Sequence, residues 1–187
     1  MPREKQYKEE EVIEKAMGLF WKNGYRNTSL RMLSKEMGIN QFSINASFGN
    51  KQKLFLESLK LYRSKLQKLI NVFENSSNGI ESIKHFFYQF AEFADQNNSK
   101  NGCLMINTMS EFGLDIDKKV GTIISNYEEQ LRTLFKHNLQ LNSTKDNQTI
   151  ERHTNYLVIA LSGLALATKI QNKITINDYI ETTFQHL

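Results

Sequence analysis

Proline and cysteine are almost absent from this sequence, since each occurs only once among 187 residues. The one proline is Pro2, so the prolines that punctuate all-β folds are missing, and a mostly helical protein is favoured. The one cysteine, Cys103, excludes an internal disulfide framework and favours a reducing, cytoplasmic compartment. The N-terminus is charged, unlike a signal peptide. The longest apolar run, residues 157–167, is shorter than the roughly 20 residues that span a bilayer, so we expect no membrane partner.

Residue patterns that carry catalysis or bind metals are also missing. The four histidines are scattered without a His-x-x-x-His pair, and the sequence has no Gly-x-Ser-x-Gly, Walker or dinucleotide-binding glycine pattern. Asp115 and Asp117 lie close together, but they precede a predicted helix and are interpreted as helix caps. We therefore expect that the protein is not an enzyme and has neither a metal nor a cofactor.

The positive charge is concentrated in the first third of the chain. In total, 24 Lys and Arg residues outnumber 20 Asp and Glu residues, which gives a formal net charge of +4. The first 55 residues hold ten of the basic and six of the acidic residues, so the remainder is neutral. This asymmetry indicates an anionic partner for the N-terminal part, although an excess of four charges also fits chance variation.

Two short predicted helices lie close together near the N-terminus, after a first helix over residues 10–23. The first helix has four apolar residues on one face, at helical spacing: Ile13, Ala16, Met17 and Phe20. The second is predicted over residues 28–37, with Asn27 and Thr28 as caps, and Gly38 ends it. A third begins within four residues, capped by Asn40, and its apolar face is Ile44 and Phe48. Two short helices joined by a glycine turn form a helix-turn-helix.

The rest of the chain also follows helical periodicity. Six more helices are predicted, over residues 51–74, 80–95, 103–111, 116–141, 149–170 and 176–186. No strand alternation, internal repeat or low-complexity tract interrupts them. The expected fold class is all-α, with about nine helices.

The run LFWKNGYRNTSLRMLSKEMGINQFSINASFGNKQKLF, residues 19–55, resembles the DNA-binding domain of TetR-family transcriptional regulators. The matching pieces are LFxxxGYxxTS, the Leu33–Ser34 pair, MGI before the third helix and FGNKxxLF after it. The resemblance is strong over residues 10–60, and beyond them it rests on length and helical organisation. It implies a three-helix DNA-binding domain in residues 1–50, joined to a helical ligand-binding and dimerisation domain in residues 51–187.

The third helix would read DNA bases, because the major groove admits one helix. Gln41 can form a bidentate contact with adenine, and Phe42 or Ala46 can contact a thymine methyl group. Helix N-termini present N–H groups to phosphate, so Thr28, Arg31 and Lys51 are expected to hold the DNA backbone, a role that the resemblance also implies for Lys51. The candidate DNA-binding residues are Thr28, Arg31, Asn40, Gln41, Phe42, Ser43, Asn45, Ala46, Ser47 and Lys51.

Asn45 departs from the family pattern, which usually has Tyr at this position to contact the DNA backbone. Asparagine can still reach a phosphate or an adenine, but it loses the packing of the ring. A second hypothesis therefore stays open, namely a helical ligand-binding or interaction protein of the same fold with weakened DNA binding.

The resemblance implies that the last two helices pair with those of a second subunit. The helix over residues 149–170 is apolar nearly all round, which fits such an interface but also fits a central helix in a monomer. The candidate interface residues are Leu157, Leu161, Leu164, Ile180 and Phe184. A two-fold dimer would require a palindromic operator in double-stranded DNA.

Aromatic residues of the body either line a cavity for an unidentified small-molecule inducer or fill the core. The candidate pocket residues are Phe86, Phe90, Phe93, Cys103, Phe112 and Tyr127. Cys103 begins a predicted helix, where the helix N-terminus lowers the pKa of a thiol. Its Gly-Cys-Leu segment resembles a subgroup that includes electrophile-sensing repressors, whereas the alternative is a small buried apolar residue. We predict a repressor that binds its operator as a homodimer and is released by a small molecule or an electrophile.

Overall fold

The computed structural model describes residues 7–95, 100–141, 143–185 and 187, and the regular structure within these ranges is helical. The helices are α1 (Glu9–Asn23), α2 (Leu30–Met37), α3 (Gln41–Phe48), α4 (Lys51–Glu74), α5 (Ile80–Ala94), α6 (Leu104–Phe112), α7 (Lys118–Gln140), α8 (Asn147–Ala167) and α9 (Lys173–Phe184). A short 3-10 helix, η2, covers Gly113–Asp115. The expected all-α fold is confirmed.

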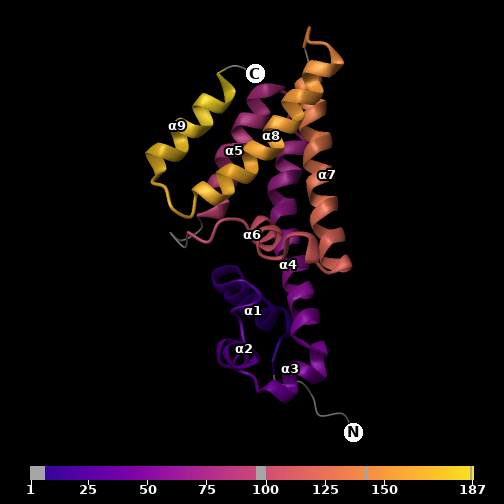
Figure 1. Ribbon diagram of the computed structural model, residues 1–187, viewed down its shortest axis with the longest axis vertical. Coiled ribbons are helices and arrows are strands. Elements are labelled where there is room, and N and C mark those ends of the chain that lie inside the picture. Colours follow the sequence, from indigo (N-terminus) through magenta and orange to yellow (C-terminus); the bar gives the residue numbers. More distant parts are fainter. Residues whose placement is uncertain (1–6, 96–99, 142, 186) are drawn as a thin grey trace.

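Helix α4 connects the two ends of an elongated molecule (Figure 1). Helices α1, α2 and α3 gather around its N-terminal half, while α5, α7, α8 and α9 form the body at the other end, and α6 lies between them. Near the start of α4, Phe55 packs edge-on against Phe20 of α1, with ring centroids 5.0 Å apart. The predicted boundary after residue 50 therefore falls where α4 begins, and α4 itself contributes to the core of both parts.

Side chains that accept hydrogen bonds from backbone N–H groups determine where most helices begin. As predicted, Asn40 caps α3 by accepting from the Ser43 N–H at 2.8 Å, and Asn50 caps α4 by accepting from the Lys53 N–H at 2.8 Å. Asp117 caps α7 as expected, whereas Asp115 ends η2. Asn172 caps α9, which therefore begins three residues earlier than predicted.

The predicted start of α2 is wrong. Ser29 is the N-cap residue, because its side chain accepts a hydrogen bond from the Met32 N–H at 3.2 Å. Thr28 is fully buried, and its hydroxyl donates to the carbonyl of Gly24 at 2.6 Å. This bond closes the turn between α1 and α2 and leaves the cap position to the next residue.

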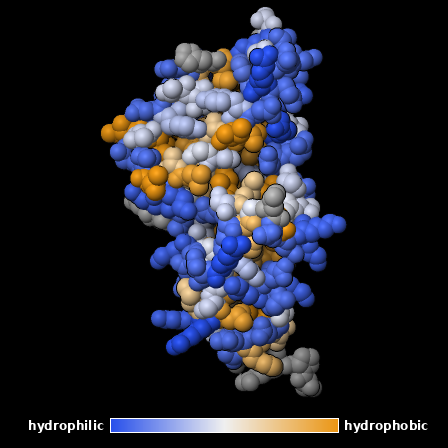
Figure 2. Space-filling view, viewed as in Figure 1, coloured by the Kyte–Doolittle hydropathy of each residue, from blue (hydrophilic) through white to orange (hydrophobic). Residues whose placement is uncertain are grey.

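Helix α8 has one apolar side in the core and another on the surface. Leu157, Leu161 and Leu164 are at most 2% exposed. On the other side, Tyr156, Ile159 and Leu166 are 47%, 71% and 46% exposed. Figure 2 shows orange, hydrophobic side chains gathered over α8 and α9. None of the helices in the described ranges is both long and apolar enough to cross a membrane.

Candidate nucleic-acid interface

One side of α3 is anchored in the core and the other faces solvent. Ile44 and Phe48 are buried, as the sequence predicts. The outer face is formed by two pairs of exposed residues that lie one helical turn apart: Gln41 with Phe42, and Asn45 with Ala46. This face carries no charge, and the Phe42 side chain is 81% exposed. It combines amide and apolar groups, which are the groups that read base edges in a major groove.

Of the three other candidate residues of the α3 segment, Asn40 and Ser47 use their side chains in local bonds, whereas Ser43 uses only its backbone N–H. The Asn40 side chain caps the helix, and the backbone N–H that it binds belongs to Ser43. The Ser47 hydroxyl lies 2.6 Å from the Tyr7 hydroxyl, which ties α3 to the segment that precedes α1. These bonds fix the position of α3. The side chains of Asn40 and Ser47 are therefore less available for DNA than the four residues of the outer face.

The turn between α2 and α3 is held in one conformation. Gly38 ends α2 with φ of 72°, a left-handed conformation that glycine adopts without strain. The Ser34 hydroxyl donates to the carbonyl of Ile39 at 2.7 Å across this turn. The orientation of α3 relative to α2 is therefore set by the backbone of the turn.

The groups expected to hold phosphate are only partly available. Arg31 is exposed in the first turn of α2, close to the N–H groups of that helix. The Thr28 side chain is buried, so its expected contact with phosphate is not possible in this conformation. Ser29, which the sequence analysis missed, takes the exposed position at the N-terminus of α2.

Lys51 stabilises the protein itself. Its ammonium donates to the carbonyls of Tyr25 at 3.0 Å and Thr28 at 2.9 Å, and it lies 4.1 Å from the centroid of the Tyr25 ring. Burial lowers the pKa of this ammonium, while Glu111 opposes the shift. Because its protons are directed at these three groups, Lys51 holds the turn after α1 and does not have the expected orientation toward phosphate.

That same turn is bound to α6, a connection that the sequence analysis missed. The Glu111 carboxylate accepts hydrogen bonds from the backbone N–H groups of Tyr25 at 2.8 Å and Arg26 at 2.6 Å. Phe112 packs on the Tyr25 ring, with centroids 5.4 Å apart. Farther along α1, the Trp21 indole donates to the carbonyl of Gly102 at 3.0 Å. The helix-turn-helix part is therefore fastened to the body through both ends of the α6 segment.

Of the six candidate pocket residues, Tyr127 lines a cavity of about 250 Å³ between α6, α7 and α8. Phe86 and Phe90 are buried against each other, with ring centroids 6.2 Å apart, so they fill the core. Phe93 packs on Trp21 and Phe112 on Tyr25, so both lie between the body and α1.

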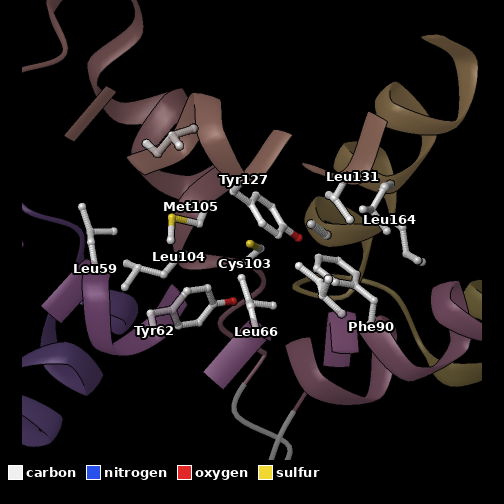
Figure 3. Close-up of a cluster of buried hydrophobic side chains, with 14 of the residues drawn as sticks. Leu59, Tyr62, Leu66, Phe90, Cys103, Leu104, Met105, Tyr127, Leu131 and Leu164 are labelled. Carbon is white, nitrogen blue, oxygen red and sulfur yellow. The ribbon is translucent and has the colours of Figure 1, made fainter. Parts of the chain in front are cut away.

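Cys103 is fully buried near the hydroxyl groups of Tyr62 and Tyr127 (Figure 3). Burial raises the pKa of the Cys103 thiol, although nearby backbone N–H groups at the start of α6 oppose the shift. The expectation that the helix N-terminus lowers this pKa is wrong, because the loss of solvent outweighs the helix terminus. The alternative of a small buried apolar residue describes Cys103 better.

We expect the Cys103 thiol to react slowly with a disulfide reagent in the native protein. Both its burial and its raised pKa reduce the population of accessible thiolate. Labelling with Ellman's reagent at pH 8 should be at least about a hundredfold slower in buffer than in urea, where the same thiol is exposed. Equal rates in the two conditions would contradict a buried, unreactive thiol.

Four of the five candidate interface residues are buried in the core of the protomer, and the fifth packs on another helix of the same chain. Leu157, Leu161, Leu164 and Ile180 are at most 2% exposed, and Phe184 packs on Phe87 with ring centroids 5.1 Å apart. The four buried side chains face the core of their own chain and are not available to a second subunit in this conformation, whereas Phe184 is partly exposed and stays a candidate for the interface. The exposed apolar residues of this region are Tyr156, Ile159, Leu166, Ile170 and Ile174.

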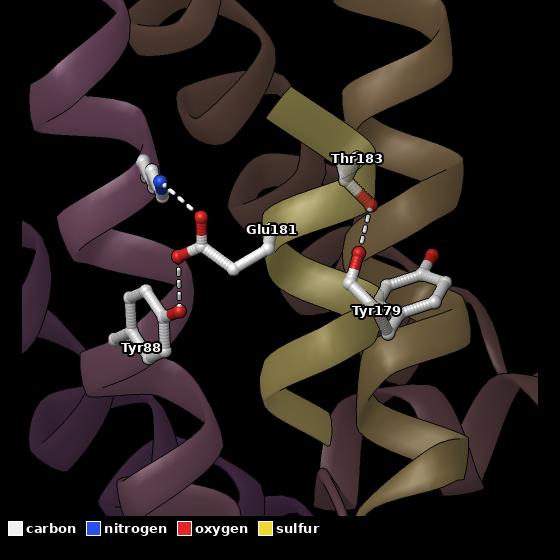
Figure 4. A network of polar contacts seen from close by, with 5 residues as sticks. Tyr88, Tyr179, Glu181 and Thr183 are labelled. Atoms are coloured by element: carbon white, nitrogen blue, oxygen red, sulfur yellow. Dashed lines mark hydrogen bonds and ion pairs between the residues drawn. The ribbon is translucent and has the colours of Figure 1, made fainter. Parts of the chain in front are cut away.

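Helix α9 is attached to α5 by a polar network (Figure 4). The Glu181 carboxylate accepts hydrogen bonds from Lys84 at 2.7 Å and from the Tyr88 hydroxyl at 2.6 Å. These bonds, led by that of Lys84, lower the pKa of Glu181, while burial and the same carboxylate raise the pKa of Tyr88 to about 12. These bonds to α5 hold α9 in place beside the exposed apolar surface of α8.

Comparisons with known proteins agree with this arrangement. Residues 12–58 match the family model described as "Bacterial regulatory proteins, tetR family". The HTH-type transcriptional repressor ComR of Escherichia coli K12 is 29% identical over 134 residues, which cover 71% of this chain and 64% of that repressor's length. The uncharacterized HTH-type transcriptional regulator YezE of Bacillus subtilis is 24% identical over the full length of both chains.

A solved structure shares the fold over nearly the whole chain. It is a cysteine mutant of the TetR family transcriptional regulator CifR, complexed with 26-bp double-strand operator DNA. The TM-score is 0.83, with 19% sequence identity, and the match covers 98% of each chain. The similarity in fold therefore includes the body as well as the helix-turn-helix part.

Proposed function

Because the chain belongs to the TetR family of transcriptional regulators, we propose that it represses transcription by binding operator DNA through α2 and α3. The observation that carries this proposal is the exposed, uncharged outer face of α3, which follows α2 across a turn closed by the bond from Ser34 to Ile39. This face has the dimensions and the groups that a major groove accepts.

In this proposal, bases and phosphates are bound by different helices. Gln41 contacts adenine, Phe42 and Ala46 contact thymine methyl groups, and Asn45 reaches a base edge or the backbone. Ser29 and Arg31 hold phosphate at the N-terminus of α2, where backbone N–H groups favour an anion. The positive charge of the first 55 residues strengthens this binding through counterion release.

The protein acts as a homodimer in this proposal. Tyr156, Ile159, Leu166 and Ile170 are spaced three, seven and four residues apart, so they share one stripe along α8 and its end. Ile174 of α9 adds to this exposed apolar surface. A contiguous apolar surface of this kind is typical of a contact with another protein, and a two-fold contact would present two copies of α3 to a palindromic operator.

The release signal is a small molecule that binds the cavity beside Tyr127. Met105 and Met109 of α6 line this cavity, and Glu111 and Phe112 at the end of the same helix hold the turn after α1. A ligand that displaces α6 would therefore move the helix-turn-helix part. Electrophile sensing is not part of this proposal, because the Cys103 thiol is buried and its pKa is raised.

Operator binding should be specific and strongly dependent on salt. We expect labelled DNA from the region upstream of the gene to bind more tightly than a scrambled duplex of the same length, as measured by fluorescence anisotropy. The logarithm of the association constant should fall linearly with the logarithm of the salt concentration, by about 0.9 for each phosphate neutralised. Equal, weak binding to both duplexes would instead favour a helical ligand-binding protein that has lost tight DNA binding.

A further inference from the structure

A groove on the body lies between α4 and α7, away from the exposed apolar stripe of α8. Its volume is about 600 Å³, and Ile123 and Asn126 of α7 form one wall. The charged side chains of its lining, among the described residues, are Lys60, Arg63 and Lys68, with no carboxylate. The remaining polar lining comes from α4, through Ser64, Gln67 and Asn71.

Arg63 has a buried hydrogen-bond donor that lacks a partner. One of its terminal nitrogens, Nη2, donates to the side-chain oxygen of Gln130. Gln130 in turn donates to the Glu74 carboxylate at 2.7 Å. The other terminal nitrogen, Nη1, is removed from solvent and has no hydrogen-bond partner. A guanidinium offers five N–H donors, and a buried donor without an acceptor is costly, so a rotation of Arg63 that brings Nη1 to an anion in the groove would supply the missing contact.

The inner side of the Arg63 guanidinium is closed by an aromatic ring. Its central carbon lies 5.3 Å from the centroid of the Tyr127 ring, and Tyr127 also lines the cavity beside α6. A ligand of Arg63 must therefore come from the groove, and it would be separate from a ligand in that cavity.

The two lysines differ in how well they are neutralised. The Lys60 ammonium forms an ion pair with Glu57 at 2.8 Å on the same helix. Lys68 is exposed and forms no ion pair with any residue in the described part of the chain. The groove therefore retains net positive charge near Arg63, with the apolar side chain of Ile123 opposite.

We propose that this groove binds a small organic anion. Its carboxylate or phosphate group binds the Arg63 guanidinium, with Lys68 supplying a second positive charge, and its apolar part packs on Ile123. Guanidinium groups bind both kinds of anion through paired hydrogen bonds, so charge and size define the ligand class. This site is additional to operator binding and to the cavity beside Tyr127.

Isothermal titration calorimetry with benzoate and with phenyl phosphate tests the site in the full-length protein. Benzylammonium serves as a probe of similar size and opposite charge. We expect saturable binding of at least one anion, with a dissociation constant of about 1 mM or tighter, and no saturable binding of benzylammonium. Failure of both anions to bind, or equal binding of the cation, would overturn the proposal.

Matched variants locate the binding. Arg63→Gln should weaken anion binding about tenfold to a hundredfold, because it removes a charged hydrogen-bond donor. Lys68→Gln, which changes an exposed side chain, should weaken it about threefold. Lys118→Gln removes an exposed charge from α7 outside the groove and should have no effect. Binding that is unchanged in both Arg63→Gln and Lys68→Gln would overturn the proposal.

Two further measurements keep the outcomes separate. If Arg63→Gln fails to fold in a thermal unfolding assay, the Lys60→Gln/Lys68→Gln double variant takes its place, with an expected loss of about tenfold. Operator binding is measured on the same wild-type sample. Operator binding without anion binding overturns only the groove site, whereas anion binding without operator binding overturns only the repressor function.

Discussion

We expect the Gln41→Ala variant to bind operator DNA at least about thirtyfold more weakly than the wild-type protein. A bidentate contact between glutamine and adenine contributes about 1–3 kcal/mol, and a two-fold dimer makes this contact twice. Losing about 2 kcal/mol in total already corresponds to a thirtyfold change in affinity. Gln41 is exposed at the first position of α3, so the fold should be unaffected. Fluorescence anisotropy at fixed salt measures the change.

The salt dependence distinguishes a base contact from a phosphate contact. Gln41→Ala should leave the slope of affinity against salt unchanged, because glutamine releases no counterion. Gln148→Ala, at an exposed position of α8 in the body, is the matched control and should bind like the wild-type protein. Wild-type affinity in Gln41→Ala would remove this residue from the proposed set of base contacts.

Local signals in the sequence predicted much of the fold. Asn40 and Asn50 cap α3 and α4 as expected, because a capping side chain binds an N–H only three residues along the chain. Ile44 and Phe48 are buried because helical periodicity alone puts them on one face. Thr28 shows the limit, since it was expected to cap α2, whereas its hydroxyl donates to the carbonyl of Gly24 and the next residue, Ser29, caps the helix.

Contacts between distant segments could not be predicted in this way. Glu111 binds the N–H of Tyr25, which lies 86 residues earlier, and no local pattern marks that carboxylate as a partner of the turn. The pKa of Cys103 depends on whether solvent or neighbouring side chains surround the start of α6, and the burial that raises it comes from other helices. The groups that connect the two ends of the molecule therefore became visible only in three dimensions.

Helix α8 illustrates the same limit for the proposed interface. A helix with apolar residues nearly all round can place any of its sides in the core, so Leu157 and Ile159 were equivalent in the sequence. Packing on the rest of the body buries Leu157 and leaves Ile159 71% exposed. The side of α8 that can face a second subunit is therefore known only once the structure shows which side packs in the core of its own chain.

The Ile159→Glu variant should therefore lose the dimer. Burying one isoleucine contributes about 1.5–3 kcal/mol, and a two-fold interface contains two copies. The loss of about 4 kcal/mol raises the dissociation constant of the dimer by about a thousandfold, and the burial of unpaired carboxylates adds to this. Sedimentation equilibrium at micromolar concentration should show a monomer. Operator affinity should fall as well, because a monomer binds one half-site only.

A charge placed on a different exposed apolar residue provides the control. Val72 of α4 is 55% exposed and is not part of the stripe along α8, so Val72→Glu should leave the dimer and operator binding unchanged. Both substitutions are at exposed positions, so thermal unfolding of the two variants should be similar after allowing for the lost interface. If Ile159→Glu sediments as a dimer, the subunits meet through another surface. The spacing of the two copies of α3, and with it the expected palindrome, would then have to be derived from that surface.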